Sequence, residues 1–310
     1  MSGSESSERS TTAQAWVGDR LVPTAQAQVS VFDRGFRSGE GVFETVRAYR
    51  THPFRLGAHL DRAAHGARIL HFDLPPRPLL NTAIMATVRS NAREGPQARA
   101  GGSWGEGDLA LRVTVTPGLI DPWSPFPGKP LGESTLVVTA QPLAHGEELY
   151  RVGVSAAAVP WARELPGIKS VSYLGAAFAR REARRLGAEE ALLTDAAGLV
   201  LEGSHSNLFT VVSGRLITPP PDAGILPGVT RAVTLEVAAE LGIPVLERPL
   251  PLAELLDAEE AFLTASTREL VPLVRVNGKP IGSGSPGPVT SALHEGYRAE
   301  VRREMAASRG

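Results

Sequence analysis

The sequence predicts a protein of mixed α and β structure that is divided into two lobes. Segments with the two-residue period of a half-buried strand alternate with segments that have the helical period of three to four residues. With 310 residues, 42% of them hydrophobic, the chain is long enough for one large or two medium domains with buried cores. The expected organisation is a disordered tail at 1–15, a small α/β domain at 16–142, an interdomain loop at 143–150 and a large domain at 151–310.

Two kinds of periodicity define the elements expected in the first lobe. Alternation of apolar and polar residues predicts strands, and apolar residues at every third or fourth position predict helices. A turn at Gly18-Asp19 and the loop 33–41 interrupt these patterns, and the Pro/Gly-rich segment 117–132 is expected to be irregular. The expected strands are 16–22, 28–32, 42–49, 109–116 and 134–140, and the expected helices are 55–70 and 79–91.

The same reasoning gives the second lobe eight strands and three helices. Two of the helices end at a glycine, Gly187 or Gly242, which is a common helix stop. The pair Asn277-Gly278 between two apolar runs is typical of a β-hairpin turn. The expected strands are 152–159, 190–194, 199–201, 208–212, 215–218, 260–264, 271–276 and 279–281, and the expected helices are 172–186, 230–241 and 289–305.

The composition excludes several functional classes. The formal net charge is −1, so the chain has no excess of positive charge for nucleic acid or an anionic membrane surface. The absence of cysteine excludes disulfides, thiolate catalysis and Cys-ligated zinc, and the seven scattered histidines form no metal-binding pair on a helix. The Ser-rich start has no apolar signal segment and no run is long enough to span a membrane, so a cytoplasmic protein is expected.

Lys169 and Glu202 are the strongest candidates for chemistry. Lys169 is one of only three lysines among 32 basic residues, and a lysine amine with a lowered pKa can form a Schiff base with a carbonyl cofactor. Glu202 ends a short apolar strand, and a carboxylate is the group that keeps a pyridine nitrogen protonated. Together they suggest pyridoxal phosphate chemistry. The alternatives are an exposed lysine at a helix start and a solvated carboxylate at a strand end.

Three further features could bind an anion. Thr230 begins a predicted helix after a Gly/Pro-rich loop, and the N–H groups and dipole at such a helix start favour phosphate. The hydroxyl cluster 264–267 follows a strand and could bind phosphate or carboxylate. Arg62 carries a guanidinium, whose geometry suits a phosphate. The ordinary alternatives are a threonine N-cap, a Ser/Thr turn and a solvated arginine.

In combination, the order and spacing of these residues resemble the class IV aminotransferases, the fold-type IV pyridoxal phosphate enzymes. The resemblance covers nearly the whole chain beyond about Ala15. In the carboxyl half the matching motifs are Lys169-Ser-x-Ser-Tyr-Leu, Glu202-Gly-x-x-Ser-Asn-Leu-Phe, Gly224-x-Leu-x-Gly-Val-Thr-Arg and Thr264-x-Ser-Thr-x-Glu-x-x-Pro. In the amino half they are Asp33-Arg-Gly-Phe, Gly39-Glu-Gly-Val-Phe-Glu-Thr and His59-Leu-Asp-Arg. The resemblance implies a small α/β N-terminal domain, a larger pseudo-barrel C-terminal domain and a homodimer.

The resemblance also implies a role for each candidate residue. Lys169 would hold pyridoxal phosphate as a Schiff base and move the proton between Cα and C4′, and Glu202 would pair with the ring nitrogen. Thr267 would contact the substrate carboxylate, and Arg37 in the opening loop is a second candidate for that contact, with a solvated arginine as the alternative. The other implied cofactor contacts are phosphate binding by Arg62, the Val229 backbone, Thr230 and Ser266, packing of Leu226 on the ring face, and approach of Tyr173 to the phenolic oxygen.

Three hypotheses for the function remain open at this point. The first is an aminotransferase that moves an amino group between an amino acid or amine and a keto acid; the second is a 4-amino-4-deoxychorismate lyase that releases pyruvate and 4-aminobenzoate; the third is a non-catalytic pyridoxal phosphate-binding protein. The spacing from Lys169 to Tyr173 is one residue shorter than in the branched-chain branch, and segment 115–118 lacks the Arg-x-His of the D-amino-acid branch. The expected partners are small amino and keto acids and a second copy of the chain, with no nucleic acid, membrane or metal.

Overall fold

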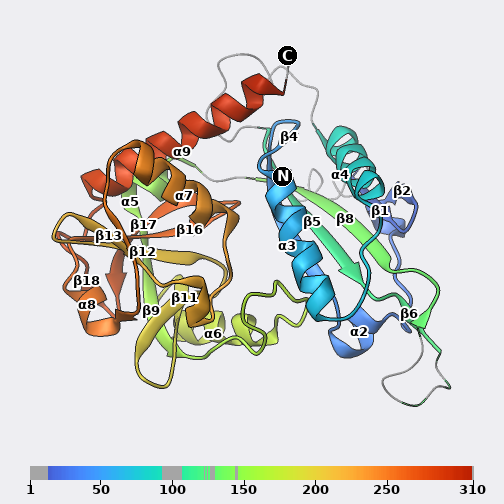
Figure 1. Cartoon of the computed structure of the whole chain (residues 1–310), viewed down its shortest axis with the longest axis horizontal. Helices are drawn as coiled ribbons and strands as arrows, with labels where there is room; N and C mark the ends of the chain where they lie inside the picture. Colours follow the sequence, from blue (N-terminus) through green and yellow to red (C-terminus); the bar gives the residue numbers. More distant parts are fainter. Residues whose placement is uncertain are drawn as a thin grey trace, which may run out of the picture. The chain divides into compact units, whose positions relative to one another are not determined.

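The computed structural model describes residues 13–92, 107–121, 123, 125, 130–143 and 146–308, and the chain divides into two compact units (Figure 1). Unit 1 comprises residues 1–144 together with 168–172, and unit 2 comprises residues 145–167 together with 173–310. The short segment 168–172, which carries Lys169, is therefore packed with the first part of the chain. The sequence alone places everything after residue 150 in the large domain.

Two parts of the expected organisation differ from the structure at their edges. Gln14 and Ala15, expected in the disordered tail, belong to strand β1 (Gln14–Val17), while residues 1–12 lie outside the described residues. Within the expected interdomain loop, helix α5 (Glu148–Val152) forms because Leu149 and Tyr150 pack against the apolar core of unit 2. The charge signals at this position therefore belong to a short amphipathic helix.

Unit 1 is built on a six-stranded antiparallel sheet that two helices cover on one face (Figure 1). Val42, Val46, Leu111 and Val113 belong to the core on the helix side, so the residues that alternate with them project from the other face. The strand order is β2 (Arg20–Pro23), β1, β8 (Thr135–Pro142), β5 (Leu109–Thr116), β3 (Val42–Tyr49) and β4 (His52–Pro53), and the helices are α3 (Leu56–Ile69) and α4 (Arg77–Asn91).

Two local predictions for the first lobe are wrong. Residues 28–32, expected to form a strand, connect the short helices η1 (Thr24–Gln26) and α2 (Arg34–Ser38) without regular structure and end in a turn at 31–32, where Ser30 accepts hydrogen bonds from the backbone N–H groups of Phe32 and Asp33. Segment 117–132, expected to be irregular, contains the two-residue strands β6 (Leu119–Ile120) and β7 (Pro130–Leu131), which pair with each other.

Unit 2 contains a curled ten-stranded sheet with helices on its outside (Figure 1). The pairs β9/β10, β9/β17 and β13/β14 are parallel and the other pairs are antiparallel. The strand order is β14 (Val245–Glu247), β13 (Arg215–Thr218), β12 (Asn207–Val212), β16 (Glu260–Ala265), β17 (Glu269–Val276), β9 (Val154–Pro160), β10 (Glu190–Thr194), β11 (Leu199–Gly203) and β15 (Leu250–Pro251), with β18 (Lys279–Pro280) paired to β17. The helices besides α5 are α6 (Leu174–Arg185), η3 (Pro221–Ala223), α7 (Val229–Glu240), α8 (Leu252–Leu256) and α9 (Pro288–Ala307).

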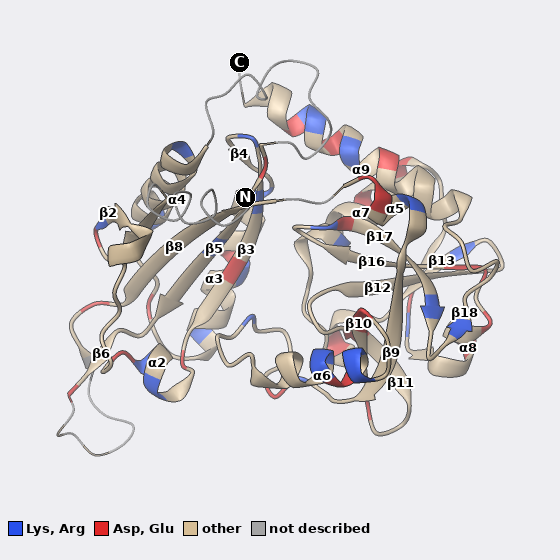
Figure 2. Cartoon of the chain, turned by 180° about the vertical axis from the view of Figure 1, so that it is seen from behind, with Lys and Arg blue, Asp and Glu red and all other residues tan. Residues whose placement is uncertain are grey.

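Several strands have the predicted bounds, and the longer helices begin or end within two residues of prediction. Strands β3, β5, β10 and β13 match the expected ranges, and α6 begins two residues later than expected. The basic residues of α6 include Arg181, Arg184 and Arg185 on its exposed side, seen in blue in Figure 2. Among the residues that the structure describes, no helix is both long enough and apolar enough to cross a membrane.

Candidate active site

Lys169 is held at the edge of the unit 1 sheet. The Phe43 N–H donates a hydrogen bond to the Lys169 carbonyl at 2.9 Å, and the Val171 N–H donates to the Gly41 carbonyl at 3.0 Å. Ile168 is buried, and a Cβ on Gly66 of α3 would lie only 3.0 Å from Val42 Cγ1 and 3.2 Å from Ile168 Cγ2. The segment is thus fixed by the edge of β3 on its backbone side and by α3 on its apolar side, which restricts where the lysine side chain can reach.

The Lys169 amine shares an aromatic ring with a second cation. Lys169 Nζ lies 4.8 Å from the centre of the Phe43 ring, and the guanidinium carbon of Arg112 lies 3.8 Å from the same centre. Arg112 lies on β5 directly opposite Thr45, so its side chain projects from the face that the helices leave uncovered. Sequence reasoning missed Arg112, although its polar position within the alternating strand 109–116 was a signal that could have identified it.

Arg62 lies on α3 in a buried cluster of charged side chains. Its Nε donates to Glu44 Oε1 at 2.8 Å and its Nη2 donates to Glu44 Oε2 at 2.6 Å, while His59 Nδ1 lies 2.8 Å from Oε2. Burial would raise the pKa of Glu44, but Arg62 and His59 together lower it to about 2. Burial is also the main cause of a lowered pKa at His59, and the cations Arg62 and Lys169 act in the same direction. Arg62 is therefore oriented by an ionised carboxylate.

Glu202 ends β11 with its side chain buried among donors. Its Oε1 accepts a hydrogen bond from Arg163 Nε, and its Oε2 accepts from Asn207 Nδ2 at 3.2 Å and from the Leu226 N–H at 3.1 Å. A carboxylate that is only 2% exposed needs such donors, because unpaired burial of a charge is costly. Sequence reasoning missed Arg163, and it quoted Asn207 only as part of the Ser-Asn-Leu-Phe motif.

The start of α7 is tied to Glu202 through the segment before it. Asn207 Nδ2 also donates to the Leu226 carbonyl at 2.9 Å, so both polar backbone groups of Leu226 are fixed next to the Glu202 carboxylate. Gly228 is the N-cap residue, and a Cβ there would overlap Asn207 Oδ1. Thr230 is therefore the second residue of the helix rather than its cap, and the N–H groups of the first turn have no acceptor within the helix. Backbone N–H groups at a helix start are groups to which anions bind in proteins.

Tyr173 and the hydroxyl cluster complete the predicted residues of unit 2. The Tyr173 phenol donates a hydrogen bond to the Ser204 carbonyl at 3.1 Å, and burial is the main cause of its raised pKa. Ser266 and Thr267 lie in the turn between β16 and β17 and are half-buried. Among the described residues, the buried hydroxyls of Ser206 and Thr264 have no hydrogen-bond partner. These positions are neighbours, because Asn207 pairs with Thr264 across the two strands.

Arg37 lies on the exposed surface of α2, with its guanidinium carbon 6.0 Å from the Phe32 ring. The preceding motif has a structural role. Asp33 caps α2 by accepting a hydrogen bond from the Gly35 N–H at 2.8 Å, and it also accepts one from Thr116 Oγ1 at 2.8 Å. A Cβ on Gly35 would overlap Thr116 Cγ2. The Asp-Arg-Gly motif thus fixes α2 on the end of β5.

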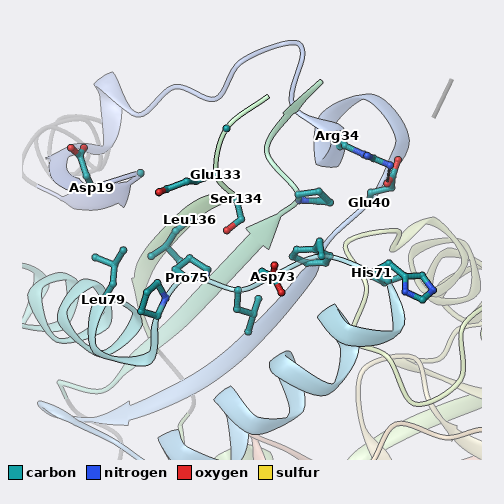
Figure 3. A pocket seen from close by; sticks show the side chains of 17 residues that line it. Asp19, Arg34, Glu40, His71, Asp73, Pro75, Leu79, Glu133, Ser134 and Leu136 are labelled. Carbon is teal, nitrogen blue, oxygen red and sulfur yellow. Dashed lines mark hydrogen bonds and ion pairs between the residues drawn. The ribbon is translucent and has the colours of Figure 1, made fainter. Parts of the chain in front are cut away.

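A cavity of about 700 Å³ opens in unit 1 away from these predicted residues (Figure 3). It is bordered by the turn at Gly18-Asp19, the segment 70–76 and the start of β8, and Figure 3 shows Arg34 and Glu40 together on one side of it. None of the predicted site residues lines it. In unit 2 the structure brings Glu202, Leu226, Val229 and Thr230 together, whereas Lys169, Arg62 and Arg37 belong to unit 1.

The chain matches one family of enzymes over most of its length. The family model "Amino-transferase class IV" matches residues 41–276. The branched-chain-amino-acid aminotransferase of Pseudomonas aeruginosa is 33% identical over 91% of this chain and 91% of its own length. The D-alanine aminotransferase of Listeria innocua is 32% identical over 93% of this chain and 96% of its own length.

Solved structures of such enzymes share the fold. Two are of a branched-chain amino acid aminotransferase from the organism abbreviated T.th., one with pyridoxamine 5'-phosphate and one complexed with N-(5'-phosphopyridoxyl)-L-glutamate. They match with TM-scores of 0.80 and 0.79, sequence identities of 32% and 31%, and coverage of 92% of this chain and 93% of each of theirs. The predicted two-lobed fold, the enzyme class and pyridoxal phosphate as the cofactor are confirmed, whereas nothing in these matches supports the lyase alternative. By sequence and by fold, this chain belongs to the class IV aminotransferases, a family of pyridoxal phosphate-dependent enzymes.

Proposed function

We propose that this aminotransferase binds pyridoxal phosphate through the residues that its motifs identify. Lys169 would hold the cofactor covalently and Glu202 would pair with its ring nitrogen. The observation that carries the proposal is the buried Glu202 carboxylate, since a pyridinium nitrogen is a partner that matches its charge. The further contacts we assign are phosphate binding by Arg62, the Val229 backbone, Thr230 and Ser266, packing of Leu226 on the ring, and approach of Tyr173 to the phenolic oxygen.

The donor and acceptor groups of each unit fit a phosphorylated pyridine. The start of α7 offers backbone N–H groups of Val229 and Thr230 to a dianion, which the helix dipole also favours. The partnerless buried hydroxyls of Ser206 and Thr264 would be satisfied by a polar ligand. In unit 1, Arg62 is held by Glu44 in an orientation that leaves its planar guanidinium rigid, which suits bidentate binding of phosphate.

The protein's own groups have distinct tasks in this proposal. When bound, pyridoxal phosphate acts as an electron sink for the bonds at the substrate Cα. Lys169 accepts the proton from Cα and returns it at C4′, so its amine must alternate between neutral and charged forms. Glu202 keeps the proton on the ring nitrogen, and its three donors hold the carboxylate in place while it does so. The Tyr173 phenol remains a hydrogen-bond donor, since burial raises its pKa.

For the substrates, we propose an α-amino acid with an apolar branched side chain as the donor and a 2-oxo acid as the acceptor. The relatives named as branched-chain aminotransferases support this class, and the Phe43 ring beside Lys169 supplies an apolar surface. Arg112, against the same ring, is suited to a second carboxylate on the acceptor. Thr267 and Arg37 remain our candidates for the substrate's own carboxylate. The match to a D-alanine aminotransferase makes D-alanine the second donor to test.

Two measurements test this function. Wild-type protein loaded with pyridoxal phosphate and freed of unbound cofactor is expected to show a pH-sensitive visible absorption band that Lys169→Ala lacks, with Lys279→Ala as the matched control. A donor screen with leucine, isoleucine, valine and D-alanine against 2-oxoglutarate then identifies the substrate class. Release of pyruvate and 4-aminobenzoate from aminodeoxychorismate without a keto acid would identify the lyase instead, and binding of the cofactor without turnover would identify a non-catalytic protein.

We also propose a homodimer, which unit 1 supports with a group of exposed apolar side chains. Phe36 on α2 is 74% exposed, and Leu119 pairs with Leu131 beside the Phe32 carbonyl, which accepts from the Ile120 N–H at 3.3 Å. Exposed apolar groups of this kind mark association surfaces. Light scattering should give twice the chain mass, and Phe36→Asp should lower it. A cytoplasmic location stays a prediction of the sequence.

A further inference from the structure

Glu190 is a buried carboxylate that the proposed chemistry does not use. It begins β10, has no exposed surface, and its Oε1 accepts hydrogen bonds from the Ser204 hydroxyl at 2.6 Å, the Ser204 N–H at 3.2 Å and the Ala191 N–H at 3.0 Å. Its Oε2 lies 3.0 Å from His205 Nδ1. His205 Nδ1 also lies 3.1 Å from the Ser204 hydroxyl oxygen. One carboxylate therefore fixes both the side chain and the backbone of Ser204.

The residue that Glu190 fixes lies between two groups of the proposed site. Ser204 follows Glu202 by two positions, in the tight turn where the Gly203 N–H donates to the Ser206 carbonyl at 2.8 Å. The Ser204 carbonyl accepts the hydrogen bond of the Tyr173 phenol at 3.1 Å. Any rotation of the peptide group between Ser204 and His205 would therefore move the carbonyl oxygen that accepts from Tyr173. The Ser204 N–H belongs to the preceding peptide and donates to Glu190 and to the Ala191 carbonyl at 2.9 Å. Together with the bond of the Ser204 hydroxyl to Glu190, this fixes the Cα from which the Ser204 carbonyl extends.

We propose that Glu190 is a positioning residue of the transamination site: through Ser204 it sets the orientation of the Tyr173 phenol relative to Glu202. This inference rests on the proposed function, in which Tyr173 and Glu202 contact the cofactor. A carboxylate suits the task better than an amide, because all four groups around it are donors or a histidine nitrogen, and an amide would turn its own NH₂ toward some of them. His205 Nδ1 lies beside the second oxygen, for which no hydrogen-bond partner is found among the described residues.

The chain offers a matched control for a purely structural carboxylate. Glu260 on β16 is also buried, and it accepts hydrogen bonds from the Val289 N–H at 3.0 Å, the Thr290 N–H at 2.8 Å and the Thr290 hydroxyl at 2.7 Å. These donors belong to the first turn of α9, so the Glu260 carboxylate stabilises a helix start instead of the turn at Ser204. Glu190→Gln and Glu260→Gln remove the same charge from similar surroundings. The two variants differ in that only Glu190→Gln removes a carboxylate that is hydrogen-bonded to Ser204.

The first test uses cofactor-free protein, so that its outcome does not depend on catalysis. Tyrosine labelled with ¹³C at the ring Cζ alone gives four signals, one for each tyrosine of the chain, and Tyr173→Phe identifies the signal of Tyr173. Glu190→Gln is expected to shift and broaden that signal, and Glu260→Gln is expected to leave it unchanged while lowering the melting temperature by a similar amount. An unchanged Tyr173 signal in folded Glu190→Gln, or the same change in both variants, would overturn the proposal.

The second test asks whether Glu190 acts through Tyr173 in the loaded enzyme. Glu190→Gln is expected to lower kcat about ten-fold with little change in KM, as loss of an outer hydrogen-bond partner does at other sites. If it acts through Tyr173, the double variant with Tyr173→Phe is no slower than Tyr173→Phe alone, whereas independent losses would multiply. Multiplied losses would overturn the proposal. A wild-type protein with no transaminase activity would instead overturn the proposed function, and the tyrosine signals would still decide whether Glu190 orients Tyr173.

Discussion

Each unit contains a buried glutamate bonded to an arginine, but we assign different roles to the two glutamates. In unit 1, Glu44 gives both oxygens to Arg62 and one of them also to His59, so the carboxylate orients a cation. In unit 2, Glu202 receives one arginine and two neutral donors, so the carboxylate is itself the oriented group. The two glutamates therefore differ in the number and kind of their partners. We assign a ligand to Glu202, which accepts from two neutral donors besides Arg163, and we assign the support of Arg62 to Glu44.

Of the two glutamates, Glu202 is the one whose substitution we expect to lower catalysis more. Glu202→Gln puts a neutral amide in place of the carboxylate that we propose keeps the ring nitrogen charged. We expect kcat to fall on the order of 10²-fold, the size found when a preorganised electrostatic contact is removed. The fold should remain, because the Arg163 side chain is 15% exposed and water can solvate it. Steady-state kinetics and circular dichroism measure the two effects. Wild-type kcat in Glu202→Gln would contradict the assigned role.

Substitution of Glu44 should instead change mainly the free energy of unfolding and the way this energy depends on pH. Its folded pKa of about 2 lies below the usual 4.5, so its contribution, on the order of 3 kcal/mol, is fully present above about pH 4.5 and is lost as the pH falls toward 2. Glu44→Gln should therefore be less stable at pH 7 and should lose less stability than wild type between pH 4.5 and 2. Urea unfolding across this range measures both. Parallel pH profiles for the two proteins would argue against an ionised Glu44.

Arg112 and Lys169 both lie against the Phe43 ring, and a substitution of Arg112 tests the proposed role of this face of the unit 1 sheet. Arg112→Met keeps much of the packing on Phe43 and removes the charge. If Arg112 binds the second carboxylate of an acceptor, KM for 2-oxoglutarate should rise about ten-fold, the value of roughly one charged hydrogen bond. KM for a monocarboxylic acceptor such as 4-methyl-2-oxopentanoate should stay constant. An equal rise for both acceptors would mean that Arg112 acts on the position of Phe43 or Lys169 instead.

The smallest effect is expected at an exposed lysine that has no place in these networks as proposed. Lys279 is exposed in the β17–β18 hairpin, and Lys279→Ala should change the free energy of unfolding by less than about 0.5 kcal/mol and leave kcat unaltered. Chemical denaturation and the standard transamination assay provide the check. A loss comparable with that of Lys169→Ala would remove the distinction between the two lysines.

The sequence was sufficient where a local pattern coincides with burial. Strands β3 and β5 were predicted with their observed bounds, because apolar side chains recur at about every second position in both; burial alternates along most of β5, whereas nearly all of β3 is buried. The same alternation at residues 28–32 was misleading, since Val29 and Val31 are exposed on a turn and pair with no strand. The period of a sequence shows that apolar and polar residues alternate. It does not show whether another part of the protein covers the apolar side chains.

Contacts between distant residues explain what sequence reasoning missed at the site. The pairing of segment 168–172 with β3 joins positions more than a hundred residues apart, and no local signal encodes it. Arg163 and Glu190 look like ordinary charged residues until the fold brings them to Glu202 and Ser204. By itself, the short spacing from Lys169 to Tyr173 disfavours branched-chain substrates. Relatives named branched-chain aminotransferases weaken that inference, because Lys169 belongs to unit 1 and Tyr173 to unit 2, and the loop between them can differ in length by one residue.

The most direct measurement maps the lysine that holds the cofactor. Borohydride reduces a carbon–nitrogen double bond to a stable amine, so protein loaded with pyridoxal phosphate can be reduced, digested and analysed by mass spectrometry. The chain has three lysines, Lys129, Lys169 and Lys279, which makes the result unambiguous. We predict one phosphopyridoxyl group per chain on the peptide that contains Lys169, and none in Lys169→Ala. A group on another lysine, or no modification of the loaded protein, would contradict the assignment of Lys169.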